Sequence, residues 1–155
     1  MTESELEKIV LQIAGNISAR YLEHGSDKFH KKGDYSWEEL TSYLEELTFI
    51  RPKSHLEKIR RHLNIIALKL CLKDYDSVTS NLYGLKKLKI PPKLIKRSEL
   101  YTSLAKKCVI WDFERETKNK NFGNAISIIE SAERKGINLP DETYKVYEMI
   151  LDQNY

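Results

Sequence analysis

Three prolines follow three aromatic residues at nearly equal distances along this chain. Each aromatic residue comes directly after an acidic or amide residue, and each proline stands about one helix later. The three stretches run from Asp34-Tyr35 to Pro52, from Asp74-Tyr75 to Pro92, and from Asn121-Phe122 to Pro140. The aromatics and the prolines therefore recur about every 40 to 48 residues, a period typical of stacked helix pairs. One such pair cannot bury its apolar face alone, so neighbouring pairs stack and leave an extended surface that commonly binds another molecule.

Apolar residues follow the helical spacing along most of the chain, and no segment alternates convincingly as a strand would. We expect about seven helices, at about 3–23, 36–51, 54–72, 75–90 and 92–117, then one ending near 135 and one beginning near 141. Two Ser-x-x-Glu patterns, at 36–39 and 54–57, predict capping boxes at the start of the second and third helices.

The third predicted helix is apolar on two sides. One stripe holds Leu56, Ile59, Leu63, Ile66 and Leu70, and a second holds Ile65, Leu68 and Leu72. A helix that is apolar over so much of its circumference belongs between two neighbours rather than on a surface. We therefore expect 54–72 in the middle of the assembly.

The 155 residues, 41% of them hydrophobic and 32% charged, are enough for one domain with its own core. No apolar run approaches the roughly 18 residues of a membrane-spanning helix, and the acidic start does not resemble a signal peptide. We expect an intracellular protein, cytoplasmic or nuclear, with no membrane partner.

Cys71 and Cys108 lie in apolar helical stretches without metal-ligand spacing, so we expect buried thiols and no metal site.

The net charge of +3 conceals a strong asymmetry along the chain. Residues 1–50 hold 5 basic and 10 acidic side chains, residues 51–100 hold 13 and 4, and residues 101–155 hold 8 and 9. The basic middle attracts an acidic peptide, nucleic acid or an acidic surface, unless the acidic first third neutralises it internally.

Several short patterns resemble tetratricopeptide repeats. They are Tyr21-x3-Gly25…Phe29…Lys32-Gly33-Asp34-Tyr35, then Asn64-x2-Ala67…Leu72-Lys73-Asp74-Tyr75-x2-Val78, and the shorter Asn121-Phe122-x2-Ala125. In that family the aromatic closes the first helix of each pair, and the concave face of the first helices binds peptides. The resemblance covers about 17–153, in units longer than the roughly 34 residues usual in the family.

The resemblance implies the fold class. We predict a single all-α helical-repeat domain over 1–155, with antiparallel helix hairpins stacked in a right-handed, tetratricopeptide-like superhelix. Its units would span approximately 3–50, 54–90 and 92–153. Asn64 matches one position of the family's carboxylate clamp, but Leu22 and Ser26 stand where that clamp has Lys and Asn. Chaperone tails are therefore not the expected partner.

Two further likenesses are more local. The last unit, over 125–144, resembles a pentatricopeptide repeat, a family that reads single-stranded RNA. The segment 56–108 resembles the small helical domains of transcription elongation factors, which dock disordered partners.

With the tetratricopeptide register, the first helices of successive units would direct five side chains into one groove. These predicted partner-binding residues are Arg60, Asn64, Lys107, Trp111 and Glu114. An aromatic residue with Arg and amide neighbours is the usual composition of an interface hot spot. The alternative interpretation is that Trp111 packs in the core while Arg60 and Arg61 are merely solvated.

A cluster of cations surrounds the joint between the fourth and fifth predicted helices. This predicted basic patch consists of Lys86, Lys87, Lys89, Lys93, Lys96 and Arg97. Phosphate binding through the patch would weaken steeply with salt. Against a single-stranded ligand, Tyr75 and Tyr83 are the only aromatic residues in the basic third of the chain, whereas single-strand binders interleave stacking residues with charges. A solvated face or an acidic protein partner is favoured.

No catalytic pattern emerges from the sequence. The four histidines are scattered, and no Ser/His/Asp, Cys/His or HExxH arrangement occurs at a usable spacing. We therefore predict a non-enzymatic adaptor, or a subunit of a larger complex, without cofactors. It would bind a helix or extended segment of another protein in its groove, and the basic patch would steer an acidic region of that partner. The alternative is an RNA- or DNA-associated helical-repeat protein that uses the patch.

Overall fold

The computed structural model describes residues 2–16 and 36–154, which contain seven helices and no strand. The prediction of an all-α fold is confirmed. The first tetratricopeptide-like match, over 21–35, lies outside the described residues, as does the end predicted for the first helix. The helices are α1 (Glu3–Asn16), α4 (Trp37–Phe49), α5 (His55–Cys71), α6 (Tyr75–Leu85), α7 (Pro92–Lys118), α8 (Phe122–Arg134) and α9 (Asp141–Asn154).

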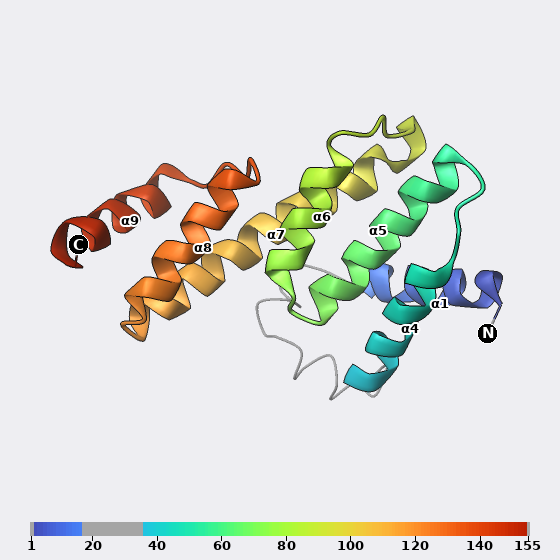
Figure 1. Ribbon diagram of the computed structural model, residues 1–155, viewed down its shortest axis with the longest axis horizontal. Helices are drawn as coiled ribbons and strands as arrows, with labels where there is room; N and C mark the ends of the chain where they lie inside the picture. Colours follow the sequence, from blue (N-terminus) through green and yellow to red (C-terminus); the bar gives the residue numbers. More distant parts are fainter. Residues whose placement is uncertain (1, 17–35, 155) are drawn as a thin grey trace.

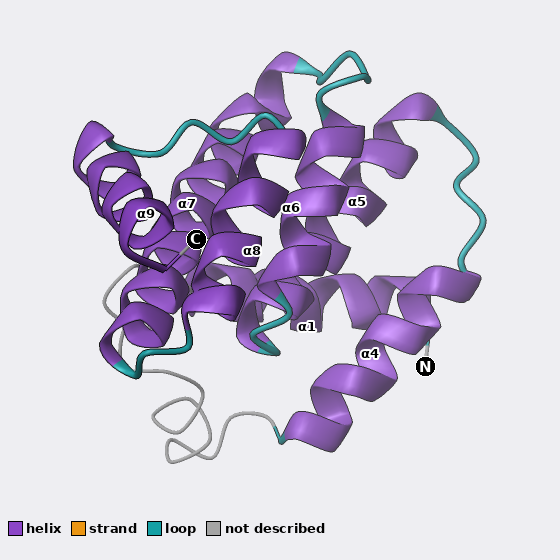
Figure 2. Ribbon diagram, turned by 60° about the vertical axis from the view of Figure 1, so that its left-hand side comes forward, coloured by secondary structure: helices purple, strands orange, loops and turns teal. Residues whose placement is uncertain are grey.

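From α4 onward each helix packs against the next one along the chain, and α5 also packs against α7. Figure 1 shows the succession from α4 on the right to α9 on the left, with the long α7 crossing behind α6. The first helix departs from this order, because α1 packs against α5 and runs across the other helices (Figure 2). Stacking of sequence neighbours agrees with an array, whereas the right-handed superhelix remains a prediction.

The helix α5 occupies the middle of the assembly, as its two apolar stripes predicted. It packs against α1, α4, α6 and α7. Both stripes are buried except for the half-buried Leu56, and Leu63 from the first and Leu68 from the second are fully enclosed. Burial on two sides makes α5 the element on which the other helices of this half of the molecule assemble.

The capping predictions are right for α4 and half right for α5. At α4 the Ser36 hydroxyl accepts from the amide of Glu39, and the Glu39 carboxylate accepts from the amide of Ser36. At α5 the Ser54 hydroxyl accepts from the amide of Glu57. The Glu57 carboxylate, however, bonds the amide of Lys53 at 2.7 Å instead of the N-cap amide.

The helix α6 ends at Leu85, more than a turn before its predicted end near Ile90. Tight turn hydrogen bonds replace the helical ones here, from the amide of Lys87 to Gly84 and from the amide of Leu88 to Leu85. The chain then extends into Pro91 and Pro92, which begin α7. The connection between α6 and α7 is consequently longer than the sequence pattern indicated, and three of the predicted patch lysines lie on it.

The core consists of two clusters that meet along α7. The first collects side chains from α1 to α7 and the second from α7 to α9. Cys108 belongs to the first cluster and Val109 to the second. Because α7 supplies both clusters, it is the element that joins the two halves of the core.

A polar contact also ties α8 to α6. The ammonium group of Lys135 lies 2.7 Å from Oδ1 of Asp76, and the Ser131 hydroxyl donates to the same oxygen at 2.9 Å. The hydrogen bonds from Lys135 and Ser131 lower the pKa of Asp76. Because the Asp76 side chain is largely exposed, the ion pair between Lys135 and Asp76 adds little to stability and mainly holds α8 in position against α6.

Within the described part of the chain, no helix combines the length and the apolar character that crossing a bilayer requires.

Candidate binding cavity and basic edge

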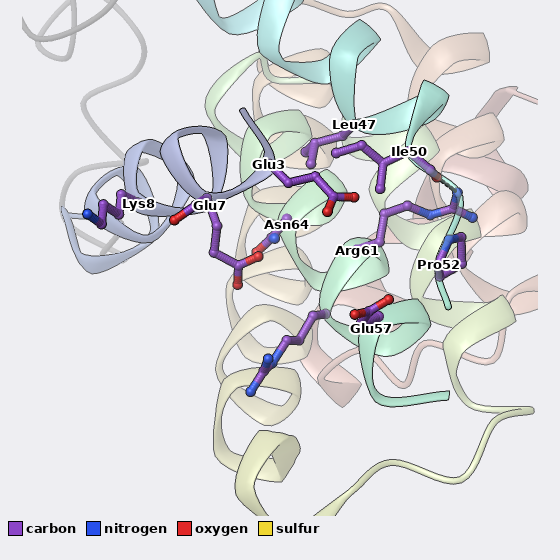
Figure 3. A pocket seen from close by; sticks show the side chains of 11 residues that line it. Glu3, Glu7, Lys8, Leu47, Ile50, Pro52, Glu57, Arg61 and Asn64 are labelled. Atoms are coloured by element: carbon purple, nitrogen blue, oxygen red, sulfur yellow. Dashed lines mark hydrogen bonds between the residues drawn. The ribbon is translucent and has the colours of Figure 1, made fainter. Parts of the chain in front are cut away.

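An open cavity of about 360 Å³ lies where α1, α4 and α5 meet (Figure 3). Its size falls within the range of small-ligand pockets and of pockets that receive a partner's side chain. Two of the predicted partner-binding residues, Arg60 and Asn64, line it. The lining residues are Glu3, Ser4, Glu7, Lys8, Leu47, Ile50, Pro52, Glu57, Arg60, Arg61 and Asn64.

The face of α5 that was expected to be an open groove is partly covered by the chain's own first helix. Leu6, Val10 and Ile13 of α1 are almost completely buried in the first core cluster. Helix α1 therefore lies on α5 and forms one wall of the cavity. Because α1 has an apolar stripe to bury and lies against α5, it occupies part of the α5 face on which Arg60 and Asn64 are predicted to line a groove.

The cavity combines an apolar wall with charges of both signs. Leu47 and Ile50 at the end of α4 supply the apolar part, and Figure 3 shows Glu3 and Glu7 reaching in from α1. Arg60 on α5 supplies one of the cations. None of the charged lining residues forms an ion pair with another residue that the structure describes. Glu57 and Arg61 already bond backbone groups. The charges of Glu3, Glu7, Lys8 and Arg60 are therefore the ones that a ligand with complementary groups would meet.

Arg61 holds the end of α4 against α5. Its Nη1 donates to the carbonyl oxygen of Ile50, the C-cap residue of α4, at 2.6 Å. A cation at a helix C-terminus also interacts favourably with the helix dipole. Its Nε is buried and has no hydrogen-bond partner among the described residues. This buried donor is thus unsatisfied among the described residues, which carries a free-energy cost for the fold.

Asn64 and Arg97 were assigned to different predicted surfaces, but the structure brings them together. The Arg97 Nη2 donates to Oδ1 of Asn64 at 2.7 Å, and its Nε donates to the Tyr101 hydroxyl at 2.9 Å. Asn64 is 2% exposed. Arg97 therefore does not belong with the exposed lysines of the predicted patch, because its guanidinium group points inward and links α7 to α5.

Replacing Asn64 by alanine is expected to lower the free energy of unfolding by about 1 kcal/mol, since the half-buried Arg97 guanidinium group would lose its acceptor on α5. Urea unfolding followed by circular dichroism measures the change. The matched control is Asn124→Ala, because Asn124 is an exposed residue of α8. Equal effects of the two substitutions would contradict a structural role for the hydrogen bond between Asn64 and Arg97.

The other three predicted groove residues lie elsewhere on α7. Lys107 and Glu114 are exposed, while Trp111 is half-buried and packs against the first core cluster. None of the three is among the described residues that line the cavity. Trp111 follows the alternative interpretation of a residue that packs on the core, and its replacement would disturb packing as well as any binding.

Three of the predicted patch lysines lie on the connection between α6 and α7, and Lys93 and Lys96 lie on the first turns of α7. His55 Nε2 donates to the carbonyl oxygen of Lys89 at 2.5 Å, which joins the start of α5 to the α6–α7 connection. Lys86 Nζ donates to the carbonyl oxygen of Gly136 at 3.2 Å, which joins the same connection to the one before α9. We define the basic edge as the exposed side chains of Lys53, Lys86, Lys87, Lys89, Lys93 and Lys96.

The two thiols are buried and unpaired, as predicted. Burial raises the pKa of Cys71 and of Cys108 to about 12 each. Neither thiol is therefore ionised at neutral pH, and thiolate chemistry is not available to them there. In the described part of the chain, no three His, Cys, Asp or Glu side chains gather as a metal site would require.

Sequence reasoning missed most of the cavity. Of the residues that line it, only Arg60 and Asn64 are among those that the sequence predicts to bind a partner. The contact between Arg97 and Tyr101 could have been predicted from the sequence, since residues four positions apart lie on the same face of a helix. No sequence signal indicated that α1 packs on α5, because an apolar stripe shows that a helix is buried without showing which element covers it.

Comparison of the chain with family models, with curated proteins and with solved structures found no match. The likeness to tetratricopeptide repeats consequently remains a prediction from the residues.

Proposed function

We propose that this protein is a non-enzymatic interaction adaptor, or a subunit of a larger complex, built as a tetratricopeptide-like helical array. A helix or extended segment of another protein binds at the cavity between α1, α4 and α5. The observation that carries the proposal is the open cavity of about 360 Å³, on whose walls lie charged side chains that form no ion pair with any residue the structure describes.

The chemistry of the cavity suits a peptide better than a purely apolar ligand. Leu47 and Ile50 receive an apolar side chain, while Arg60 offers donors to carbonyl or carboxylate oxygens. Glu3 and Glu7 attract a basic group at the other wall. Apolar contact with a few convergent polar groups is the usual composition of a specific site.

The test is an affinity pull-down from source-cell extract with the wild-type chain and the Arg60→Glu variant, each with and without nuclease treatment. A protein partner that survives nuclease treatment and loses at least about tenfold in recovery with the variant would support the proposal. Trp111 is left unchanged, because its packing on the core would confuse lost binding with lost folding.

The matched control is Lys58→Glu, which makes the same charge change on the same helix. Lys58 is exposed and does not line the cavity. Equal loss of the partner in both variants would show a general charge effect and refute a cavity site. Disappearance of all protein partners after nuclease treatment would instead favour the nucleic-acid alternative.

A further inference from the structure

We propose that the basic edge is a second docking surface, separate from the cavity, and that it binds an acidic protein segment carrying an apolar residue. The inference goes beyond the proposed function, because the edge and the cavity share no lining residue. The sequence predicted that the lysines of this region steer an acidic region of the partner bound in the groove, whereas the proposal here makes the edge a docking surface of its own.

The structure turns that run into a continuous surface. The hydrogen bond from His55 to Lys89 holds the connection before α5 beside the one between α6 and α7, so Lys53 extends the predicted patch. The bond from Lys86 to Gly136 extends the same edge toward α9. Figure 1 shows these three connections along the upper side of the molecule.

The positive charge of the edge is not neutralised within the described part of the chain. None of its six lysines forms an ion pair there, and the acidic helices α1 and α4 contribute no partner to them. Of the acids that flank the edge in sequence, Glu57 already accepts the amide of Lys53. Binding an anionic partner lowers the free energy of a set of unpaired positive charges. The partner that binds the edge should therefore be negatively charged.

Two observations favour a protein over a nucleic acid as the occupant. Tyr75 is buried, and the Lys87 ammonium group lies over one face of the Tyr83 ring, 4.6 Å from its centroid, although Tyr83 itself is 42% exposed. A base that stacked on this face would have to displace the ammonium group. All its cations are lysines, which lack the planar fork with which arginine reads guanine edges.

An exposed apolar side chain lies among the lysines. Ile95 is 40% exposed and stands on the first turns of α7 between Lys93 and Lys96. An apolar residue in the partner would cover it, while acidic residues on either side meet the two ammonium groups. This pairing gives a peptide a contact that a phosphate backbone cannot use.

Fluorescence anisotropy with the full chain tests the proposal. The probes are a labelled Glu-rich peptide containing leucine, a labelled single-stranded oligouridine and a labelled DNA duplex. The edge variant carries Lys89→Glu, Lys93→Glu and Lys96→Glu. The control variant carries Lys118→Glu, Lys120→Glu and Lys145→Glu, which changes the net charge equally at exposed positions away from the edge. Circular dichroism verifies that both variants are folded.

We expect the peptide to bind the wild type more tightly than either nucleic acid does. We also expect the edge variant to lose at least about tenfold in affinity and the control variant less than about threefold. Ile95→Ser is expected to weaken peptide binding without affecting residual oligonucleotide binding. The Arg60→Glu variant should bind the acidic peptide as the wild type does. The experiment therefore tests the edge independently of the binding site proposed at the cavity.

Three results would overturn the proposal. Tighter binding of an oligonucleotide, lost in the edge variant, would make the edge a nucleic-acid surface. Equal weakening by the edge and control variants would mean that net charge alone attracts the peptide. No measurable binding of any probe would leave the edge a solvated face.

Discussion

Replacing Leu63 by alanine should lower the free energy of unfolding by about 3 kcal/mol, within the range observed for leucine in a packed core. Leu63 is fully buried on α5, the helix that packs against four others. The substitution removes apolar contacts and leaves a cavity in the first core cluster. Urea unfolding measures the loss as a shift of the midpoint at unchanged slope.

Leu100→Ala is the matched control for that experiment, because it is the same substitution at a helical position. Leu100 lies on α7 and is 45% exposed. We expect its replacement to change the free energy of unfolding by less than about 0.5 kcal/mol. If the two substitutions destabilised the protein equally, α5 would not be the centre of the core.

Replacing Val10 by aspartate should release α1 from α5. Val10 is fully buried on the inner face of α1, and an aspartate there would place an uncompensated carboxylate among apolar side chains. We expect the docking of α1 to weaken by about 3 kcal/mol, which corresponds to about a hundredfold in the docking equilibrium. Hydrogen exchange measured by mass spectrometry should show faster exchange along α1 than in the wild type, while the amides of α8 keep their protection.

The neighbouring residue supplies the control. Leu11 is 47% exposed, so Leu11→Asp adds the same charge to the same helix without entering the core. We expect exchange along α1 to stay within about threefold of the wild type, because surface substitutions rarely cost more than about 0.5 kcal/mol. Similar acceleration in both variants would mean that α1 does not depend on its apolar face for docking.

The Val10→Asp variant also has a consequence for the cavity. Helix α1 contributes Glu3, Ser4, Glu7 and Lys8 to its lining, so release of α1 removes one wall. A partner that inserts between α1 and α5 would lose affinity in this variant. A partner that instead binds the face of α5 beneath α1 would gain affinity, because it would no longer compete with the helix.

Local sequence signals determined the helices of this protein. The capping pattern at Ser36 and Glu39 predicted the start of α4, and both of its hydrogen bonds are present. The two stripes of the segment 54–72 predicted the central position of α5, which the packing confirms. These inferences succeeded because capping and helical periodicity depend on residues within a turn or two of one another.

The tertiary structure alone decided which side chains meet. The sequence placed Asn64 in a groove and Arg97 on a basic surface, yet the two are hydrogen-bonded to each other. It showed that α1 needs a partner for its apolar face, and only the fold shows that α5 is that partner. The physical reason is that the hydrophobic effect is not directional. An apolar stripe on a helix must be covered by some other element, but the stripe does not determine which element that is. The cavity and the basic edge both arise from that choice of neighbours.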